Sequence, residues 1–338
     1  MTDRSQPAPT RRALLAGASA LAAAAVAPRA TAQNADAAAP DFSGKSVLIT
    51  GTSSGFGQLT ALYLARASAT VIASMRNLNG GARQEARDLM AIAAGEELDL
   101  HVVDIDVTDD ALVTSGVAEA ETIAGGALDV VVNNAGIGMA GPVEINDMEA
   151  TRLIFETNLY GYLRVARAAL PAMRDAGEGL IVNVSSQLGR FVIPGLGMYC
   201  ATKFGLEAMF ETLAYELAPF GVETTIVQPG GYPTKIWENG VRYTEDLVSR
   251  VEETRREAYG GHIAISEGMM TGEYFTDPMD VPRAIAEIIA MPAGQRPLRR
   301  PVHPNPAAAV AANTALAGVQ AQVLGGGRFA PWHAAVTD

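Results

Sequence analysis

The chain has 338 residues, of which 49% are hydrophobic and 18% charged, and its formal net charge is −12 at pH 7. This composition is typical of a soluble globular protein with enough apolar residues to form a core. An acidic chain without a basic stripe argues against a nucleic-acid partner, and a single cysteine excludes an internal disulfide bond. Its four histidines lack the spacing of metal ligands, so we expect no metal site.

The first 32 residues are typical of an export signal and not of a fold. Arg11 and Arg12 precede an alanine-rich apolar stretch, and Ala30-Thr31-Ala32 has the A-x-A pattern of a signal peptidase site. The arginine pair resembles a twin-arginine signal, and the stretch is too short and too weakly hydrophobic for a good membrane span. We therefore expect residues 1–32 to be cleaved from a periplasmic protein that does not stay inserted in the membrane. The alternatives for this segment are a disordered tail or an uncleaved anchor. If it is not an export signal, we expect the protein to be cytoplasmic.

A glycine-rich turn follows the first predicted strand. Residues 33–43 are expected to be a linker, and the apolar strand at 45–50 leads into Gly51-Thr52-Ser53-Ser54-Gly55-Phe56-Gly57. The three glycines allow the backbone to turn tightly and to approach a pyrophosphate at the start of the next helix, predicted at 59–67. A strand before the turn and a helix after it are the context that this motif requires. The residues expected to bind the nucleotide here are Gly51, Ser53, Ser54, Gly55, Phe56 and Gly57.

The end of the second predicted strand, at 70–74, bears on the choice of nucleotide. An acidic residue there would bind the ribose 2′-hydroxyl of NAD, but the chain has Met75 followed by Arg76. An arginine can hold the 2′-phosphate of NADP with its planar guanidinium group. The sequence therefore favours NADP (NADPH) over NAD, with an Arg76 that is merely exposed as the alternative.

A tyrosine and a lysine are placed to act together on a predicted helix. Tyr199 and Lys203 lie four residues apart, so they share one helix face and are one turn from each other. A lysine ammonium at that distance would stabilise a phenolate and lower the pKa of the tyrosine from its ordinary value of about 10. Thirteen residues earlier, the apolar run from Leu180 ends at Ser186, which a buried strand would deliver to the same region.

Taken in this order, the motifs resemble those of the classical short-chain dehydrogenase/reductase family, from about residue 45 to about 302. They are the glycine-rich turn, Asn133-Asn134-Ala135-Gly136, Ser186 and the Tyr199–Lys203 pair. The glycine-rich turn and Ser74-Met75-Arg76-Asn77 are similar to those of hydroxysteroid and retinol dehydrogenase-like members. The resemblance implies an α/β fold, a single doubly wound parallel-sheet Rossmann domain with helices on both faces. Unbroken alternation of strand and helix patterns agrees with one domain, at 44–303.

The resemblance also implies a role for each site residue. Tyr199 would move the proton, Ser186 would donate a hydrogen bond to the substrate oxygen, and Lys203 would lower the pKa of the tyrosine and bind the nicotinamide ribose. Asn158 would support a water relay near the lysine. The further nucleotide contacts implied are Arg76, Asp106, Val107, Asn133, Ala135, Gly136, Tyr199, Lys203, Pro229, Gly230 and Thr234.

Residues 232–280 resemble the variable substrate lid of the family. Their aromatic and methionine side chains could line an apolar pocket or could pack the lid onto the body. These residues are Trp237, Tyr243, Tyr259, Met269, Met270, Tyr274 and Phe275. The tail at 304–338, rich in alanine, proline and glycine, is given no predicted structure.

The expected function is an oxidoreductase that interconverts a small-molecule alcohol and a ketone or aldehyde by hydride transfer. Two alternatives stay open, a non-catalytic dinucleotide-binding or sensing protein and an epimerase or dehydratase of the same family. The complete set of Asn158, Ser186, Tyr199 and Lys203 argues against the first, and the lack of a larger C-terminal substrate domain argues against the second. By analogy with the family we expect a homodimer or homotetramer.

Overall fold

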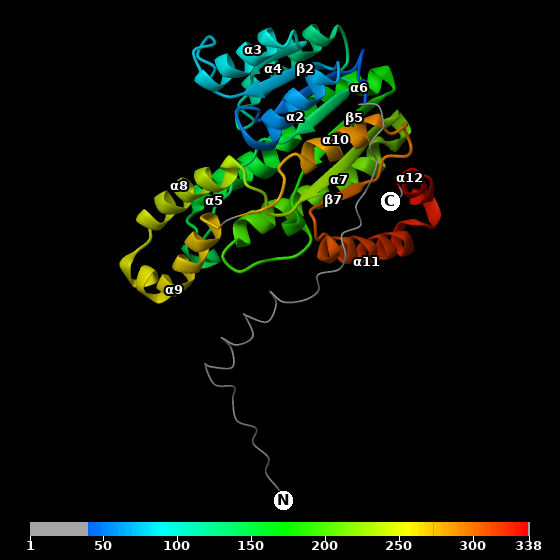
Figure 1. Cartoon of the computed structure of the whole chain (residues 1–338). Coiled ribbons are helices and arrows are strands. Elements are labelled where there is room, and N and C mark those ends of the chain that lie inside the picture. The colour runs from blue at the N-terminus through cyan, green and yellow to red at the C-terminus, as the bar shows by residue number, and fades with distance from the viewer. Residues whose placement is uncertain (1–39, 273, 337–338) are drawn as a thin grey trace, which may run out of the picture. The chain divides into compact units, whose positions relative to one another are not determined.

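The computed structural model describes residues 40–272 and 274–336, and Pro40–Asp338 forms one compact unit (Figure 1). The predicted export signal and all but the last residues of the predicted linker lie outside the described residues.

A seven-stranded parallel sheet forms the centre of the unit, with strand order β3-β2-β1-β4-β5-β6-β7. The strands are β1 (Ser46–Thr50), β2 (Thr70–Met75), β3 (Leu100–Asp104), β4 (Val130–Asn133), β5 (Gly179–Val184), β6 (Val222–Pro229) and β7 (Arg299–Val302). The chain first builds the sheet from β1 outward to β3 and then crosses to the other side of β1 to add β4. The order therefore reverses between β1 and β4, where open α/β sheets bind their ligands.

Helices cover both faces of this sheet, which confirms the predicted doubly wound fold. The α-helices among the described residues are α2 (Gly55–Arg66), α3 (Gln84–Gly95), α4 (Asp110–Ala124), α5 (Met148–Phe155), α6 (Gly161–Ala176), α7 (Gly197–Leu217), α8 (Lys235–Ser249), α9 (Glu253–Met270), α10 (Asp280–Ala290), α11 (Ala307–Leu324) and α12 (Ala330–Ala334). Buried side chains of α2, α3 and α10 form the core on one face, and those of α4, α6 and α7 form the core on the other.

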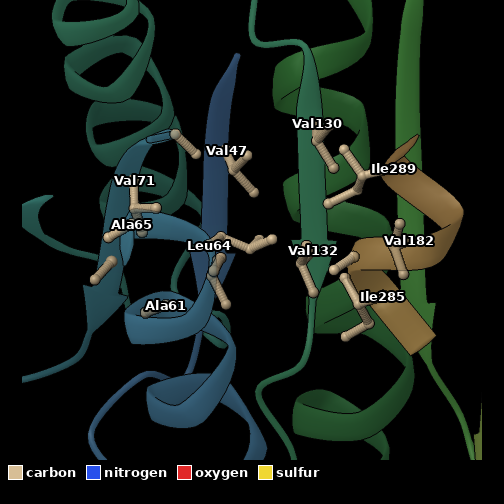
Figure 2. Close-up of a cluster of buried hydrophobic side chains, with 14 of the residues drawn as sticks. Val47, Ala61, Leu64, Ala65, Val71, Val130, Val132, Val182, Ile285 and Ile289 are labelled. Atoms are coloured by element: carbon tan, nitrogen blue, oxygen red, sulfur yellow. The ribbon is translucent and has the colours of Figure 1, made fainter. Parts of the chain in front are cut away.

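The apolar runs of the strands supply both cores because successive side chains point to opposite faces. In β1, Val47 and Ile49 belong to the core with α2 and α10, whereas Leu48 belongs to the core with α6 and α7. Figure 2 shows the first of these cores, in which Val47 and Val132 face Leu64 of α2 and Ile285 of α10. Burial on both faces explains why the strands show continuous apolar sequence and not alternation.

Two segments that the sequence left without secondary structure are helical. The predicted lid contains α8 and α9, which lie against each other. The C-terminal segment contains α11 and α12, which contact β7 and α7 respectively. Among the described residues, α11 is the helix with the length and composition of a membrane span, at a mean hydropathy of 1.3 with 11% of it buried.

Candidate active site

A cavity of about 900 Å³ lies at the carboxyl ends of the strands, where the strand order reverses. Nearly every predicted site residue lines it, from the glycine-rich turn to Thr234. The exceptions are Gly57 and Asn133, which the structure places beneath the lining. Gly57 packs under the turn, and Asn133 is buried and donates to Asn183 Oδ1 at 3.0 Å. These two residues support the cavity floor and do not border the space that a nucleotide would fill.

The glycine-rich turn is shaped for a close approach of backbone to ligand. Gly51 has a φ of +72°, and a Cβ there would lie 2.8 Å from Ala135 Cα. A Cβ on Gly57 would lie 2.4 Å from the Gly51 carbonyl oxygen. The turn leads into α2, and Ser54 at its N-cap makes no side-chain capping bond to the first helical N–H groups. Those N–H groups and the helix dipole therefore suit the pyrophosphate of a dinucleotide.

Two arginines border the cavity beyond the end of β2. Arg76 Nη2 lies 3.5 Å from the hydroxyl of Tyr243, and Arg76 Nη1 lies 4.0 Å from Asp106 Oδ2. Arg83, which sequence reasoning missed, lines the same region and donates a hydrogen bond to the Arg76 carbonyl oxygen. The sequence offered no signal for Arg83, because it lies in a loop whose course is set by tertiary contacts. The predicted contact Asp106 lines the cavity and also orders its own loop by accepting from Thr108 N at 3.0 Å.

Three predicted catalytic side chains converge at the inner end of the cavity. Ser186 follows β5, and Tyr199 lies in the first turn of α7, where the Ser186 hydroxyl acts to lower the Tyr199 pKa. Lys203 is one turn further along α7 and is 4% exposed. Its Nζ donates to the Val184 carbonyl oxygen at 3.0 Å and lies 5.8 Å from the centre of the Tyr199 ring. Tyr162, a residue that sequence reasoning missed, presents its ring 5.2 Å from the same Nζ.

The acid–base balance of this group differs from the prediction. Burial raises the pKa of Tyr199 to about 12, although its hydrogen bond to Ser186 acts in the opposite direction. Burial likewise lowers the pKa of Lys203 to about 7. The expected lowering of the Tyr199 pKa by Lys203 is therefore wrong, because loss of hydration disfavours both the phenolate and the ammonium. The Tyr199 side chain is partly exposed and borders the cavity.

Asn158 lies in a π-helical turn, Glu156–Tyr160, between α5 and α6. It is fully buried, and its amide holds the backbone of Ile137 through two hydrogen bonds. Single π-helical turns occur often at functional sites. In this structure the side chain joins the segment after β4 to the helix that carries Tyr162.

The predicted lid borders the outer part of the cavity. Trp237 of α8 stacks on Tyr274, with ring centres 4.6 Å apart and an interplanar angle of 14°. Both residues line the cavity together with Tyr243, Met269 and Met270. The other two lid aromatics do not line it: the Tyr259 hydroxyl bonds to Glu144, and Phe275 is 92% exposed. The lid therefore contributes an apolar cluster of aromatic and methionine side chains to the cavity that also contains Ser186 and Tyr199.

Comparisons with known proteins agree with this geometry. Residues 45–243 match a family model described as short chain dehydrogenase. Relatives include an uncharacterized oxidoreductase, YusZ, of Bacillus subtilis, 39% identical over 58% of this chain and 68% of its own length. Retinol dehydrogenase 8 of Bos taurus is 38% identical over 56% of this chain, and the match spans 60% of that relative. A solved short-chain dehydrogenase from Streptomyces avermitilis is 30% identical, with a TM-score of 0.65 over 82% of this chain and 95% of its own.

Proposed function

The chain belongs to the short-chain dehydrogenase/reductase family of NAD(P)-dependent oxidoreductases, and from that premise we propose that it interconverts an alcohol and a ketone or aldehyde with NADP(H). The observation that carries the proposal is the convergence of Ser186, Tyr199 and Lys203 in the cavity that also contains the glycine-rich turn. A protein that only held a dinucleotide would have no use for this arrangement.

The nicotinamide ring, when bound, would supply or accept the hydride. Tyr199 would donate its hydroxyl proton to the substrate oxygen during reduction and take it back during oxidation. The Ser186 hydroxyl, within hydrogen-bonding reach of Tyr199, would donate to the same oxygen as negative charge develops there. Lys203 would bind the ribose of the nucleotide through its ammonium group.

Three features support NADP over NAD. Met75 occupies the position where an acidic residue would bind a ribose 2′-hydroxyl. Arg76 borders the cavity beside it, and Arg83 is bonded to the Arg76 backbone. The Arg76 guanidinium would provide charge-assisted hydrogen bonds to a 2′-phosphate, which NAD lacks. Arg83 pairs with Glu85 at 3.1 Å and would support the Arg76 backbone.

The lid favours an apolar substrate. The stacked pair Trp237 and Tyr274, with Met269 and Met270, provides wide apolar surface. The charged lid residues Lys235, Glu238 and Arg242 line other parts of the same cavity. Methionine side chains adapt to irregular shapes, so this apolar surface suits a bulky alcohol such as a retinoid or a hydroxysteroid better than a small hydroxy acid.

The experiment that tests this function has two stages. Titration of the purified protein with NADPH and with NADH, followed by nicotinamide fluorescence, measures the preference for each nucleotide. Reduction of NADP is then followed at saturating nucleotide with retinol, a 17β-hydroxysteroid and lactate. We expect tighter binding of NADPH and turnover with at least one bulky alcohol and not with lactate. Failure to bind either nucleotide would overturn the proposal.

Export and assembly are proposals that rest on the sequence. We propose that the protein is carried folded to the periplasm by the arginine pair Arg11-Arg12, and that it acts there as a homodimer or homotetramer that retains its nucleotide. Cell fractionation should find wild-type protein in the periplasm and an Arg11→Lys, Arg12→Lys variant in the cytoplasm. Sedimentation of the purified protein should give the mass of two or four copies. The same distribution of the two proteins between periplasm and cytoplasm would contradict the export proposal. A monomeric mass would contradict the assembly proposal.

A further inference from the structure

A buried group of charged side chains lies directly behind the catalytic residues of α7. Glu207, one turn after Lys203, is 1% exposed. Its Oε2 lies 2.8 Å from Nε of Arg299 on β7, and its Oε1 accepts from Gln228 Nε2 on β6 at 2.8 Å. Arg299 also pairs with Glu211, one further turn along α7, at 2.5 Å. The helix that carries Tyr199 and Lys203 is thus joined to two strands by buried charge-assisted bonds.

The same carboxylate reaches the turn that follows Ser186. Arg190 Nη1 lies 3.7 Å from Glu207 Oε2, and both side chains are buried. Gly189 packs so closely on α7 that a Cβ there would lie 2.8 Å from Glu207 Cγ and 3.1 Å from the Lys203 carbonyl oxygen. The turn that positions Ser186 therefore rests on the part of α7 between Lys203 and Glu207.

We propose that Glu207 is a positioning residue of the active site, whose buried carboxylate holds a negative charge one helical turn from Lys203 and fastens the turn after Ser186 to α7. This inference rests on the proposed function, because it assumes that Lys203 and Ser186 take part in the reaction. Glu207 itself does not line the cavity, so it would not contact substrate or nucleotide.

The groups around Lys203 determine in which direction loss of Glu207 should move the Lys203 pKa. The groups that contact its ammonium are the Val184 carbonyl oxygen on β5 and the rings of Tyr162 on α6 and Tyr199 on α7. Glu207 lies one helical turn further along α7, also buried, and acts on the ammonium through its charge. Glu207 opposes the effect of burial on the Lys203 pKa. Replacing it with glutamine keeps the size of the side chain but removes a negative charge, while Arg190 and Arg299 keep their positive charges. Lys203 should then lose its proton at lower pH.

The lysine content of the chain makes this directly measurable. Lysines occur at positions 45, 203 and 235 alone, so protein labelled with 13C at lysine Cε gives few signals, and Lys203→Met assigns the one of interest. In nucleotide-free wild type we expect the Lys203 signal to titrate near pH 7. In Glu207→Gln the midpoint should fall by about one pH unit.

Glu211→Gln is the matched control, since it removes the other carboxylate bound to Arg299 from the same face of α7. Its Lys203 midpoint should stay close to that of wild type. Glu207→Asp, which keeps the negative charge, should also have a midpoint close to that of wild type. An unchanged midpoint in Glu207→Gln, or an equal shift in both glutamine variants, would overturn the proposal. If Glu207→Gln does not fold, Glu207→Ala against Glu211→Ala provides the same comparison, because both variants remove a carboxylate.

Kinetics separate this inference from the proposed function. At pH 8 we expect kcat/KM of Glu207→Gln to be about 10-fold below that of Glu211→Gln, with the difference shrinking as the pH is lowered. Wild-type protein that turns over no alcohol would refute the proposed function, yet the NMR titration would still decide whether Glu207 sets the charge of Lys203.

Discussion

Asn158 uses both ends of its side-chain amide on the backbone of one residue, Ile137. Its Oδ1 accepts from Ile137 N at 2.8 Å, and its Nδ2 donates to the Ile137 carbonyl oxygen at 2.9 Å. Asn158 is fully buried, so these bonds have no competition from water. The pair fixes the segment after β4 to the π-helical turn, and that segment forms part of the floor of the cavity.

We predict that Asn158→Ala lowers the free energy of unfolding by about 2–4 kcal/mol, because it leaves a buried N–H and a buried C=O without partners. Urea unfolding followed by circular dichroism measures the change. Asn146→Ala is the control, because Asn146 also donates to backbone carbonyl oxygens, but from a half-buried position near α5. A loss no larger in Asn158→Ala than in Asn146→Ala would contradict the role given to the pair.

Arg76→Ala should weaken NADPH binding roughly 10- to 100-fold and leave NADH binding unchanged, because the lost hydrogen bonds go to a phosphate that NADH lacks. Fluorescence titration with each nucleotide gives the two dissociation constants. Arg87→Ala, on α3 and outside the cavity lining, should affect neither. Equal weakening of NADPH and NADH binding would mean that Arg76 contacts a part of the nucleotide that both share, and not the 2′-phosphate.

Burial of the Lys203 ammonium should make the free energy of unfolding depend on pH. Its pKa in the folded protein, about 7, lies below the ordinary value of 10.5, so between these values the unfolded chain binds more protons than the folded one. The contribution of Lys203 to the free energy of unfolding therefore rises with pH across this window. Below about pH 7 Lys203 is protonated in both states, so the folded protein is destabilised by the whole penalty of burying the ammonium. We expect the stability of Lys203→Met relative to wild type to be highest at pH 6 and to decrease towards pH 10. A difference independent of pH would refute the lowered pKa.

Trp237→Ala should raise KM for a bulky apolar alcohol about 10-fold, because the change removes the ring that stacks on Tyr274 at the cavity wall. NADPH affinity should change little. Phe275→Ala serves as the control, since that ring is 92% exposed and does not line the cavity. If the two variants have the same KM, the lid does not form the substrate wall.

Much of the site could be predicted from sequence because each motif stands at the end of an apolar run. Ser186 follows a buried strand, and Gly51 follows another, and parallel strands bring their carboxyl ends to one edge of the sheet. The pairing of Tyr199 with Lys203 follows from helix geometry alone. These relations depend on local structure and on strand direction, which periodicity reveals.

The rest depends on contacts between segments distant in sequence. Lys203 donates to Val184, and Glu207 meets Arg299 across 92 residues, so neither partner is signalled by local spacing. The raised pKa of Tyr199 reflects enclosure by several elements, which a spacing rule omits. The alanine-rich α11 shows no polar and apolar faces in its sequence. Its position beside β6 and β7 is set by tertiary contacts, such as that of Asn313 Nδ2 with Gln228 Oε1 on β6, at 2.8 Å.

The most direct test of the central claim is the single-turnover rate of hydride transfer from bound NADPH in Tyr199→Phe, measured beside its NADPH dissociation constant. The phenylalanine ring keeps the shape of the site and removes only the hydroxyl that moves the proton. We predict a rate about 100- to 10,000-fold below that of wild type, at unchanged NADPH affinity. A rate within a few-fold of wild type would contradict the assignment of Tyr199 as the acid and base of the reaction.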